Sequence, residues 1–201
     1  MTITKGQPWG SPASLPDGAV LARTDRDISV ALDEARRTAT PYPTFGVLGG
    51  DLCHTLGGQD DVQRLRSGAT AFPIDIGEVL VDGRHRFFAA HVVAHSRGWR
   101  RFAVVMNAQW VGELNFGPKA HPNDGVLDGY EATLDFFEWR KVKARLPSGT
   151  HLPHPRIKPT RAAAVTFEFP TPLPVFIDGE AIGPARHLAA RVVPDAIRVI
   201  A

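Results

Sequence analysis

Three features are scarce in this sequence, and each scarcity excludes a class of protein. Its one cysteine, Cys53, cannot form an internal disulfide and is typical of a reducing compartment. No stretch approaches the roughly 20 apolar residues of a membrane-spanning helix, and residues 1–10 lack the apolar core of a signal peptide. The third scarce feature is net charge, which is only +2. We therefore expect a cytoplasmic protein without a transmembrane segment.

The positive charges are small in net terms, but they are clustered. They fall in three groups, within residues 97–101, 140–145 and 156–161. A single group of this kind is most often a solvated face. If the three groups share a face, candidate partners are an anionic membrane surface, to which the protein would be peripheral, and a phosphorylated small molecule or lipid. Nucleic-acid-binding motifs are absent from the sequence, so we expect no nucleic-acid partner.

Proline and glycine are plentiful, and they separate short apolar runs. With 17 Pro and 19 Gly, this spacing favours many short strands over long helices. The clearest pair is a hairpin of residues 74–81 and 86–94 around Asp82-Gly83. Further strands are expected at residues 102–110, 126–134, 163–169, 175–177, 188–193 and 197–200. The sequence predicts a mainly β (α+β) fold built on a sandwich or barrel, with a helix at residues 136–146.

The N-terminal part has a different pattern. Residues 1–18 indicate an extended arm, residues 19–57 a strand–helix–strand unit, and residues 58–201 the β domain. In the middle unit, Thr24 and Asp27 have the spacing of a capping box, and apolar residues follow at helical spacing. A glycine turn follows the second strand of this unit.

Histidines and nucleophiles give weak signals. His85, His91 and His95 would share one face of a predicted strand, as zinc ligands could. However, residues four or more apart on a strand are separated by about 13 Å, so a solvated strand face is the better interpretation. The sequence has no Gly-x-Ser-x-Gly motif. Cys53 and His54 are neighbours in sequence and would not face one another as a catalytic pair.

Acidic side chains are the remaining candidates for chemistry. Asp75 stands between two isoleucines in a predicted strand, so its carboxylate needs a partner. The turn Asn123-Asp124-Gly125 follows a proline and points a carboxylate and carbonyls into one small volume, which suits a hard cation. Taken alone, this turn and the later acidic turn at residues 177–180 are each also typical of the tip of a β-hairpin. Several converging carboxylates would repel one another unless a cation or protons lay between them.

A series of motifs resembles one known family. They occupy residues 49–57, 74–77, 118–128, 149–155 and 175–180. For example, Ile74-Asp75-Ile76-Gly77 is similar to the family's Val-Asp-(Ile/Leu)-Gly strand. From about residue 44 onward, the chain resembles the bacterial diacylglycerol kinase/sphingosine kinase-like lipid kinases. The resemblance implies a two-sheet β-sandwich of the C-terminal type, with the nucleotide-binding domain truncated to a small remnant.

The resemblance also implies three sets of site residues. A structural Mg²⁺ would be bound by the carboxylate of Asp124 and the carbonyls of His121 and Val126. The cofactor-binding turn would comprise Gly49, Gly50 and Asp51. The catalytic acids, which share a network facing the cleft with Asp51, would be Asp75, Asp178 and Glu180.

One departure from the family argues against ATP binding. Where the family has its glycine-rich phosphate loop, this chain has residues 22–26 without a glycine, and side chains there block the approach of phosphate to backbone N–H groups. We therefore predict a non-catalytic or partner-dependent module that binds a lipid or a phosphate. The first alternative is an active Mg²⁺-dependent lipid kinase in which Arg23 and Arg26 replace the loop, and the second is a homodimeric scaffold.

Overall fold

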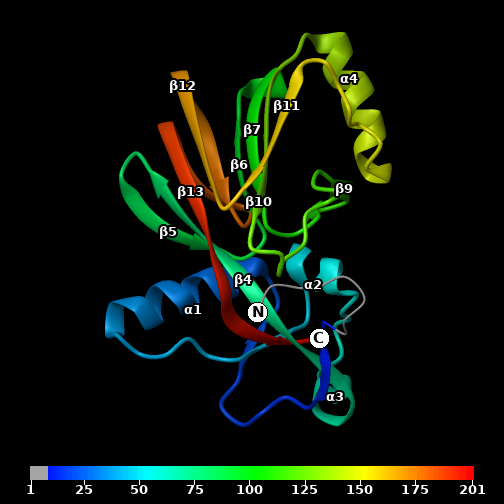
Figure 1. Cartoon of the computed structure of the whole chain (residues 1–201), viewed down its shortest axis with the longest axis vertical. Coiled ribbons are helices and arrows are strands. Elements are labelled where there is room, and N and C mark those ends of the chain that lie inside the picture. The colour runs from blue at the N-terminus through cyan, green and yellow to red at the C-terminus, as the bar shows by residue number, and fades with distance from the viewer. Residues whose placement is uncertain (1–8) are drawn as a thin grey trace.

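The computed structural model describes residues 9–201, so residues 1–8 of the predicted arm lie outside the described residues. Figure 1 shows an elongated molecule with most of the strands towards one end and α1, α2 and α3 at the other. The helices are α1 Asp25–Thr38, α2 Gly50–Leu56, α3 Val62–Ser67 and α4 Phe136–Arg145, with 3-10 turns η1 Arg97–Trp99 and η2 Leu146–Ser148. The strands are β1 Ser11–Ala13, β2 Val20–Ala22, β3 Phe45–Val47, β4 Ala69–Val81, β5 Arg84–Phe88, β6 His91–His95, β7 Arg101–Met106, β8 Trp110–Val111, β9 Leu114–Asn115, β10 Leu127–Thr133, β11 Ile157–Ala162, β12 Ala164–Ile177 and β13 Glu180–Ile200.

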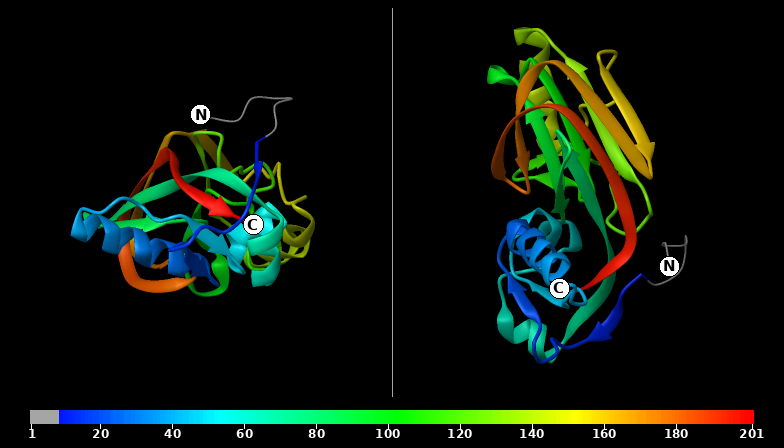
Figure 2. Two further views of the ribbon diagram at one scale, coloured as in Figure 1. Left: turned by 90° about the horizontal axis from the view of Figure 1, so that it is seen from below. Right: turned by 90° about the vertical axis from the view of Figure 1, so that its left-hand side faces the viewer.

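The predicted mainly β sandwich is confirmed, and its two layers are parts of one hydrogen-bonded sheet. Across the described residues, an 11-stranded sheet has the main order β1-β4-β13-β12-β6-β7-β10-β11, and β8 and β9 form a separate pair. The end of β12, at Val175 to Ile177, pairs with β6 and so connects the layers. Buried side chains of β4, β12 and β13 pack with those of β6, β7 and β10 in one apolar core. Figure 2 shows this curled sheet from two further sides.

The strands β4 and β13 carry the sheet out of the sandwich and into the helical end. They pair antiparallel from Leu188–Val81 to Ile200–Ala71, with a register shift between Val193 and Ile197. There β3 joins β13 in parallel, and β2 joins β3 in parallel. The α1, α2 and β3 side chains share a second apolar core with β4 and β13. The strand–helix–strand unit is therefore an extension of the same sheet.

The predicted return strand of residues 86–94 is wrong in its second half. The hairpin partner of β4 is β5, which ends at Phe88, and β6 begins at His91 in the other layer. His85 and His91 therefore lie on different strands. His91 is 3% exposed, so the interpretation of these histidines as one solvated face is also wrong.

Other strand boundaries differ for identifiable reasons. Residues 163–169 and 175–177 belong mostly to one strand, β12, and residues 188–193 and 197–200 belong to β13. The irregular register inside both strands explains why the apolar pattern is interrupted there. The unpredicted β11 pairs only with β10 among the described residues. Its proline and charged side chains suit such an edge position.

The helix α1 begins where the capping box was predicted. The Thr24 hydroxyl accepts a hydrogen bond from the Asp27 N–H at 3.3 Å, and the Asp27 carboxylate accepts from the N–H groups of Thr24 and Arg23. Ile28 and Leu32 of the helix are buried. The cap fixes the first turn of α1 and thereby places Asp25, its first residue.

Thr24→Ala should lower the free energy of unfolding by about 1 kcal/mol, because it removes the side-chain acceptor of the cap. Thr24→Ser is the matched control, since it keeps the hydroxyl and should stay near wild type. Urea unfolding followed by circular dichroism measures both variants. Equal stability of Thr24→Ala and wild type would show that the cap contributes nothing.

Candidate functional site

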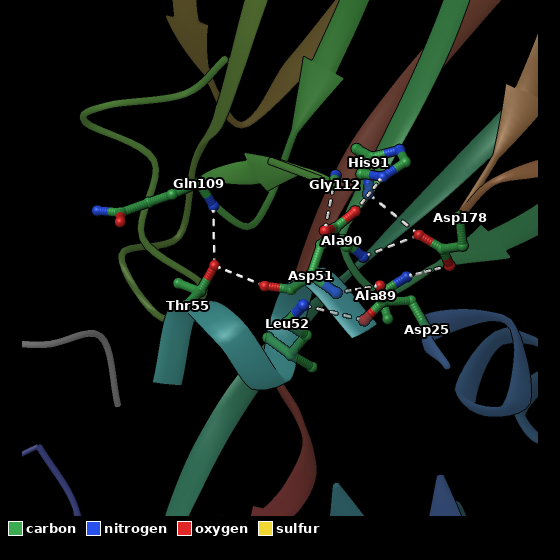
Figure 3. A network of polar contacts seen from close by, with 10 residues as sticks. All are labelled: Asp25, Asp51, Leu52, Thr55, Ala89, Ala90, His91, Gln109, Gly112 and Asp178. Carbon is green, nitrogen blue, oxygen red and sulfur yellow. Dashed lines mark hydrogen bonds and ion pairs between the residues drawn. The ribbon is translucent and has the colours of Figure 1, made fainter. Parts of the chain in front are cut away.

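Four buried or half-buried ionisable side chains meet where the helical end joins the sandwich (Figure 3). They are Asp25 of α1, Asp51 of α2, His91 of β6 and Asp178 of the turn between β12 and β13, and we call them the acid network. Figure 3 shows all four pointing toward one another from these separate elements. The network brings together two predicted site residues, Asp51 and Asp178, with two that the sequence did not indicate as site residues.

The carboxylate of Asp178 accepts three successive backbone N–H groups. These come from Ala89 at 2.8 Å, Ala90 at 3.0 Å and His91 at 3.1 Å. Asp178 has a positive φ of 48°, and Gly179 follows at 81°, a pair typical of a type I′ hairpin turn. The turn therefore aims its carboxylate at the break between β5 and β6, where ladder hydrogen bonds are missing.

Asp25 closes the glycine turn that was predicted to bind a cofactor. Its carboxylate accepts the N–H groups of Asp51 at 2.6 Å and Leu52 at 3.0 Å. Gly50 has a φ of +89°, and a Cβ there would lie 2.7 Å from Oδ1 of Asp25. At Gly49, a Cβ would lie 2.5 Å from the Arg23 carbonyl oxygen. Both glycines are therefore required for close packing within the chain.

Asp51 is hydrogen-bonded to His91, the fourth member of the acid network. Its Oδ2 lies 2.8 Å from Nε2 of His91, and its Oδ1 accepts the N–H of Gly112 at 2.9 Å. Thr55 extends this connection, because its hydroxyl donates to the Asp51 carbonyl and accepts the N–H of Gln109. The helix α2 is thus tied both to β6 and to the loop around β8.

Burial and the repulsion between carboxylates favour the protonated forms of the side chains in the acid network. Burial, assisted by the charge of Asp178, raises the pKa of Asp25 to about 7. Burial also raises the pKa of Asp178. Burial alone would lower the pKa of His91, but the hydrogen bond to Asp51 and the charge of Asp178 outweigh it, so this pKa is raised. The direction of this shift favours the protonated form of His91, in which Nε2 donates to Asp51.

A second polar centre surrounds Asp75. Its carboxylate, in a residue only 1% exposed, accepts the N–H groups of Gly125 and Asp195, each at 2.8 Å. Burial raises its pKa. Asn107 connects this centre to the acid network, because its Nδ2 donates to the carbonyls of Asp75 at 2.9 Å and Ala89 at 2.8 Å. The expectation that Asp75 needs a partner is met by backbone donors.

The predicted metal ligands His121, Asp124 and Val126 lie beside Asp75. An arginine, Arg161, binds the carboxylate of Asp124. Asp124 pairs with Arg161, and Arg161 Nη1 also donates to Asp128 at 2.9 Å. Among residues 9–201, no group of three or more His, Cys, Asp or Glu side chains is arranged to hold a metal ion. These contacts do not fit Mg²⁺, since the guanidinium already supplies the positive charge.

The two other members of that set make contacts within the turn. Nδ1 of His121 accepts the N–H of Asn123 at 3.2 Å, and the N–H of Val126 donates to Oδ1 of Asp124 at the same distance. The Asp124 carboxylate is therefore shared between a backbone donor and Arg161. Such a turn is stabilised by the chain's own groups.

Glu180 lies apart from both centres. It forms an ion pair with Arg26 at 2.7 Å, and its side chain is 39% exposed. The catalytic acids implied by the resemblance are thus divided among three environments. The two members that sequence reasoning missed, Asp25 and His91, left different signals. Asp25 stood in the place of the phosphate loop, whereas His91 stood in a predicted strand and was interpreted as part of a solvated face.

Comparisons with known proteins define the class. Residues 63–201 match the family described as the YegS C-terminal NAD kinase beta sandwich-like domain, and the chain belongs to this family. The structure is similar to a putative diacylglycerol kinase from Bacillus anthracis str. Sterne, with a TM-score of 0.60 and 14% identity over 79% of this chain and 69% of that chain. A second structure of a putative diacylglycerol kinase from this organism gives a TM-score of 0.58, also at 14% identity, over 79% and 69% of the two chains.

The predicted resemblance to diacylglycerol kinase-like lipid kinases is therefore confirmed for the C-terminal domain. At 14% identity, the structural likeness shows the fold. No curated protein matches the chain in sequence. Within the described residues, every helix is too short or too polar to cross a bilayer.

The raised pKa values of Asp25 and His91 predict that the contribution of these two groups to stability falls as pH rises. Both groups bind protons more tightly in the folded chain, so the folded state loses relative stability as Asp25 ionises between about pH 4 and pH 7 and as His91 deprotonates above its ordinary range. Each excess proton contributes a slope of up to about 1.4 kcal/mol per pH unit.

Urea unfolding at intervals from about pH 5 to about pH 8 measures this slope. Asp25→Asn should flatten it, since the amide does not titrate. Asp17→Asn removes an exposed carboxyl and should leave the slope unchanged. The same slope in Asp25→Asn as in the wild-type protein would contradict the protonation of the acid network.

Proposed function

We propose that this chain is a diacylglycerol kinase-like protein that binds a lipid or a phosphorylated ligand and does not transfer phosphate from ATP. One observation carries the second part of the proposal. The carboxylate of Asp25 takes the N–H groups of Asp51 and Leu52 at the start of α2. Free N–H groups at such a turn are what a phosphate requires.

The charges around that turn also oppose a triphosphate. Asp25, Asp51 and Asp178 converge there, and His91, the basic side chain among them, is already hydrogen-bonded to Asp51. A nucleotide would bring further negative charge into this low-dielectric region, where like charges repel strongly. Phosphoryl transfer depends on positioning and on charge stabilisation, largely by metal ions. The contacts of Asp124 with Arg161 leave Mg²⁺ little support at the implied metal position.

The alternative of a kinase with a rearranged phosphate site has less support. It needs Arg23 and Arg26 to bind phosphate in place of glycine N–H groups. Arg23 pairs with Asp60 at 2.9 Å, and Arg26 pairs with Glu180 at 2.7 Å. Both guanidinium groups would have to leave an existing carboxylate.

A cavity lined by β10, β11 and the segment that precedes β11 supports the ligand-binding part of the proposal. Its volume is about 760 Å³, within the range of roughly 300–1,000 Å³ that ligand pockets occupy. Its lining includes the apolar side chains of Leu152 and Ile157, the basic ones of Lys119 and His154, and the ion pair of Arg161 with Asp128. Apolar walls with a few basic side chains suit a lipid that carries an anionic head group.

The first test concerns ATP. We expect no heat of binding when ATP and Mg²⁺ are titrated into the protein, and no labelled phosphate on diacylglycerol presented in detergent micelles. The physical reason is the occupied turn at the start of α2. Labelled product that disappears in Asp178→Asn would contradict the proposal and favour an active kinase.

The second test concerns the cavity. Dioctanoyl phosphatidic acid, a short-chain soluble probe, should raise the thermal unfolding midpoint of the wild-type protein. Lys119→Glu should weaken this binding about tenfold or more, because a charge-assisted contact of about 1.5–3 kcal/mol is lost. Arg66→Glu, which makes the same charge change at an exposed position of α3, should bind the probe like wild type. Equal affinities for the two variants would show that the cavity is not the binding site.

A further inference from the structure

The end of the sandwich that carries α4 exposes two adjacent phenylalanines. Phe136 is 58% and Phe137 70% exposed, the two highest values for large apolar side chains among the described residues. The opposite face of α4 is buried through Trp139 and Val142. Large aromatic side chains in water are unfavourable, and adjacent exposed ones are typical of an interaction surface.

The three basic groups of the sequence converge on this same end. Leu134, which precedes the cap of α4, donates its N–H to the Arg100 carbonyl at 2.7 Å and so places η1 beside α4. Arg156 pairs with Glu138 of α4 at 3.1 Å, which brings in the segment that leads to β11. We call this surface the α4 end. Its basic side chains belong to residues 97–101, 140–145 and 156–158.

Two acidic side chains of α4 and its cap are engaged within the protein. Asp135 caps α4, and Glu138 completes the capping box and pairs with Arg156. The net charge of the whole chain is only +2, so the positive charge is concentrated at this end. A concentration of this kind attracts an anionic surface over a Debye length.

The α4 end is also held rigidly. The Trp99 ring of η1 stacks on Trp139 of α4, with centroids 5.3 Å apart, and on His95 at 4.1 Å. Phe136 and Phe137 are the first two residues of α4, directly after its capped N-terminus. The Arg140 guanidinium lies 6.0 Å from the Phe136 ring centroid. Aromatic and cationic groups are therefore presented together on a fixed helix.

We infer that the α4 end docks on an anionic membrane surface, with Phe136 and Phe137 inserted at the level of the head groups and the surrounding basic side chains bound to lipid phosphates. Exposed aromatic side chains beside Lys and Arg are the combination that binds the bilayer interface. An acidic protein would match the charge but would not account as well for two protruding phenylalanines. In this arrangement α1, α2 and α3 point away from the bilayer (Figure 1). The inference does not rest on the proposed function, since it uses no residue of the acid network or the cavity wall named above.

Sedimentation with lipid vesicles tests the electrostatic part. The wild-type protein should bind vesicles that contain phosphatidylglycerol, bind pure phosphatidylcholine vesicles much less, and lose binding as salt rises. Arg140→Glu/Lys141→Glu should reduce the partition coefficient about tenfold or more. Arg36→Glu/Arg37→Glu makes the same change in net charge on α1 and should bind nearly as wild type. An equal loss in the two double variants would overturn the inference, as would failure of the wild-type protein to bind.

A second measurement tests insertion. Phe136→Ser/Phe137→Ser should weaken vesicle binding while keeping its salt dependence, and Val30→Ser, at a site 53% exposed on α1, should not. Phe137→Cys can be labelled selectively with a polarity-sensitive dye, because Cys53 is buried and burial raises the pKa of its thiol to about 11. The dye should shift to the blue on anionic vesicles. An unshifted dye on bound protein, or stronger binding to duplex DNA than to vesicles, would overturn the inference.

Discussion

The carboxylate of Asp178 is the constraint on which the rest of the structure depends. It takes three N–H groups at the point where the chain leaves β5 and crosses to the other layer as β6. Each of these donors would be unfavourable by about 1–3 kcal/mol if buried without a partner. The same turn joins β12 to β13, the longest hairpin in the described residues. One carboxylate thus connects both layers of the sandwich and sets where the helical end attaches.

The acid network and the polar centre around Asp75 show how acidic side chains can have structural contacts in this chain. Backbone donors surround Asp25, Asp75 and Asp178, and a guanidinium binds Asp124. The polar atoms of these side chains are therefore satisfied within the protein. Under the proposed function, recognition of a ligand is the role left to this fold, and other surfaces of the sandwich would serve it.

Sequence patterns predicted those structural features that depend on residues close together in the chain. The capping box at Thr24, the helix α4 and the Asp82-Gly83 turn follow from residues only a few positions apart. The break between β5 and β6 depends on Asp178, 89 positions after Ala89, and no local pattern contains it. Likewise, Arg161, which binds the carboxylate of Asp124, lies 37 residues away from it. Long-range pairing therefore decided each of these differences between prediction and structure.

The parallel pairing of β3 with β13 has a consequence for the order of assembly. Phe45 pairs with Val199, so β3 has only β2 as a neighbour until β13 has been synthesised. Contacts across such a separation slow folding, because the loop they close is long. On the ribosome, β2, β3 and α1 would therefore remain with one sheet edge unpaired, and it is during this interval that a chaperone would have the most to protect.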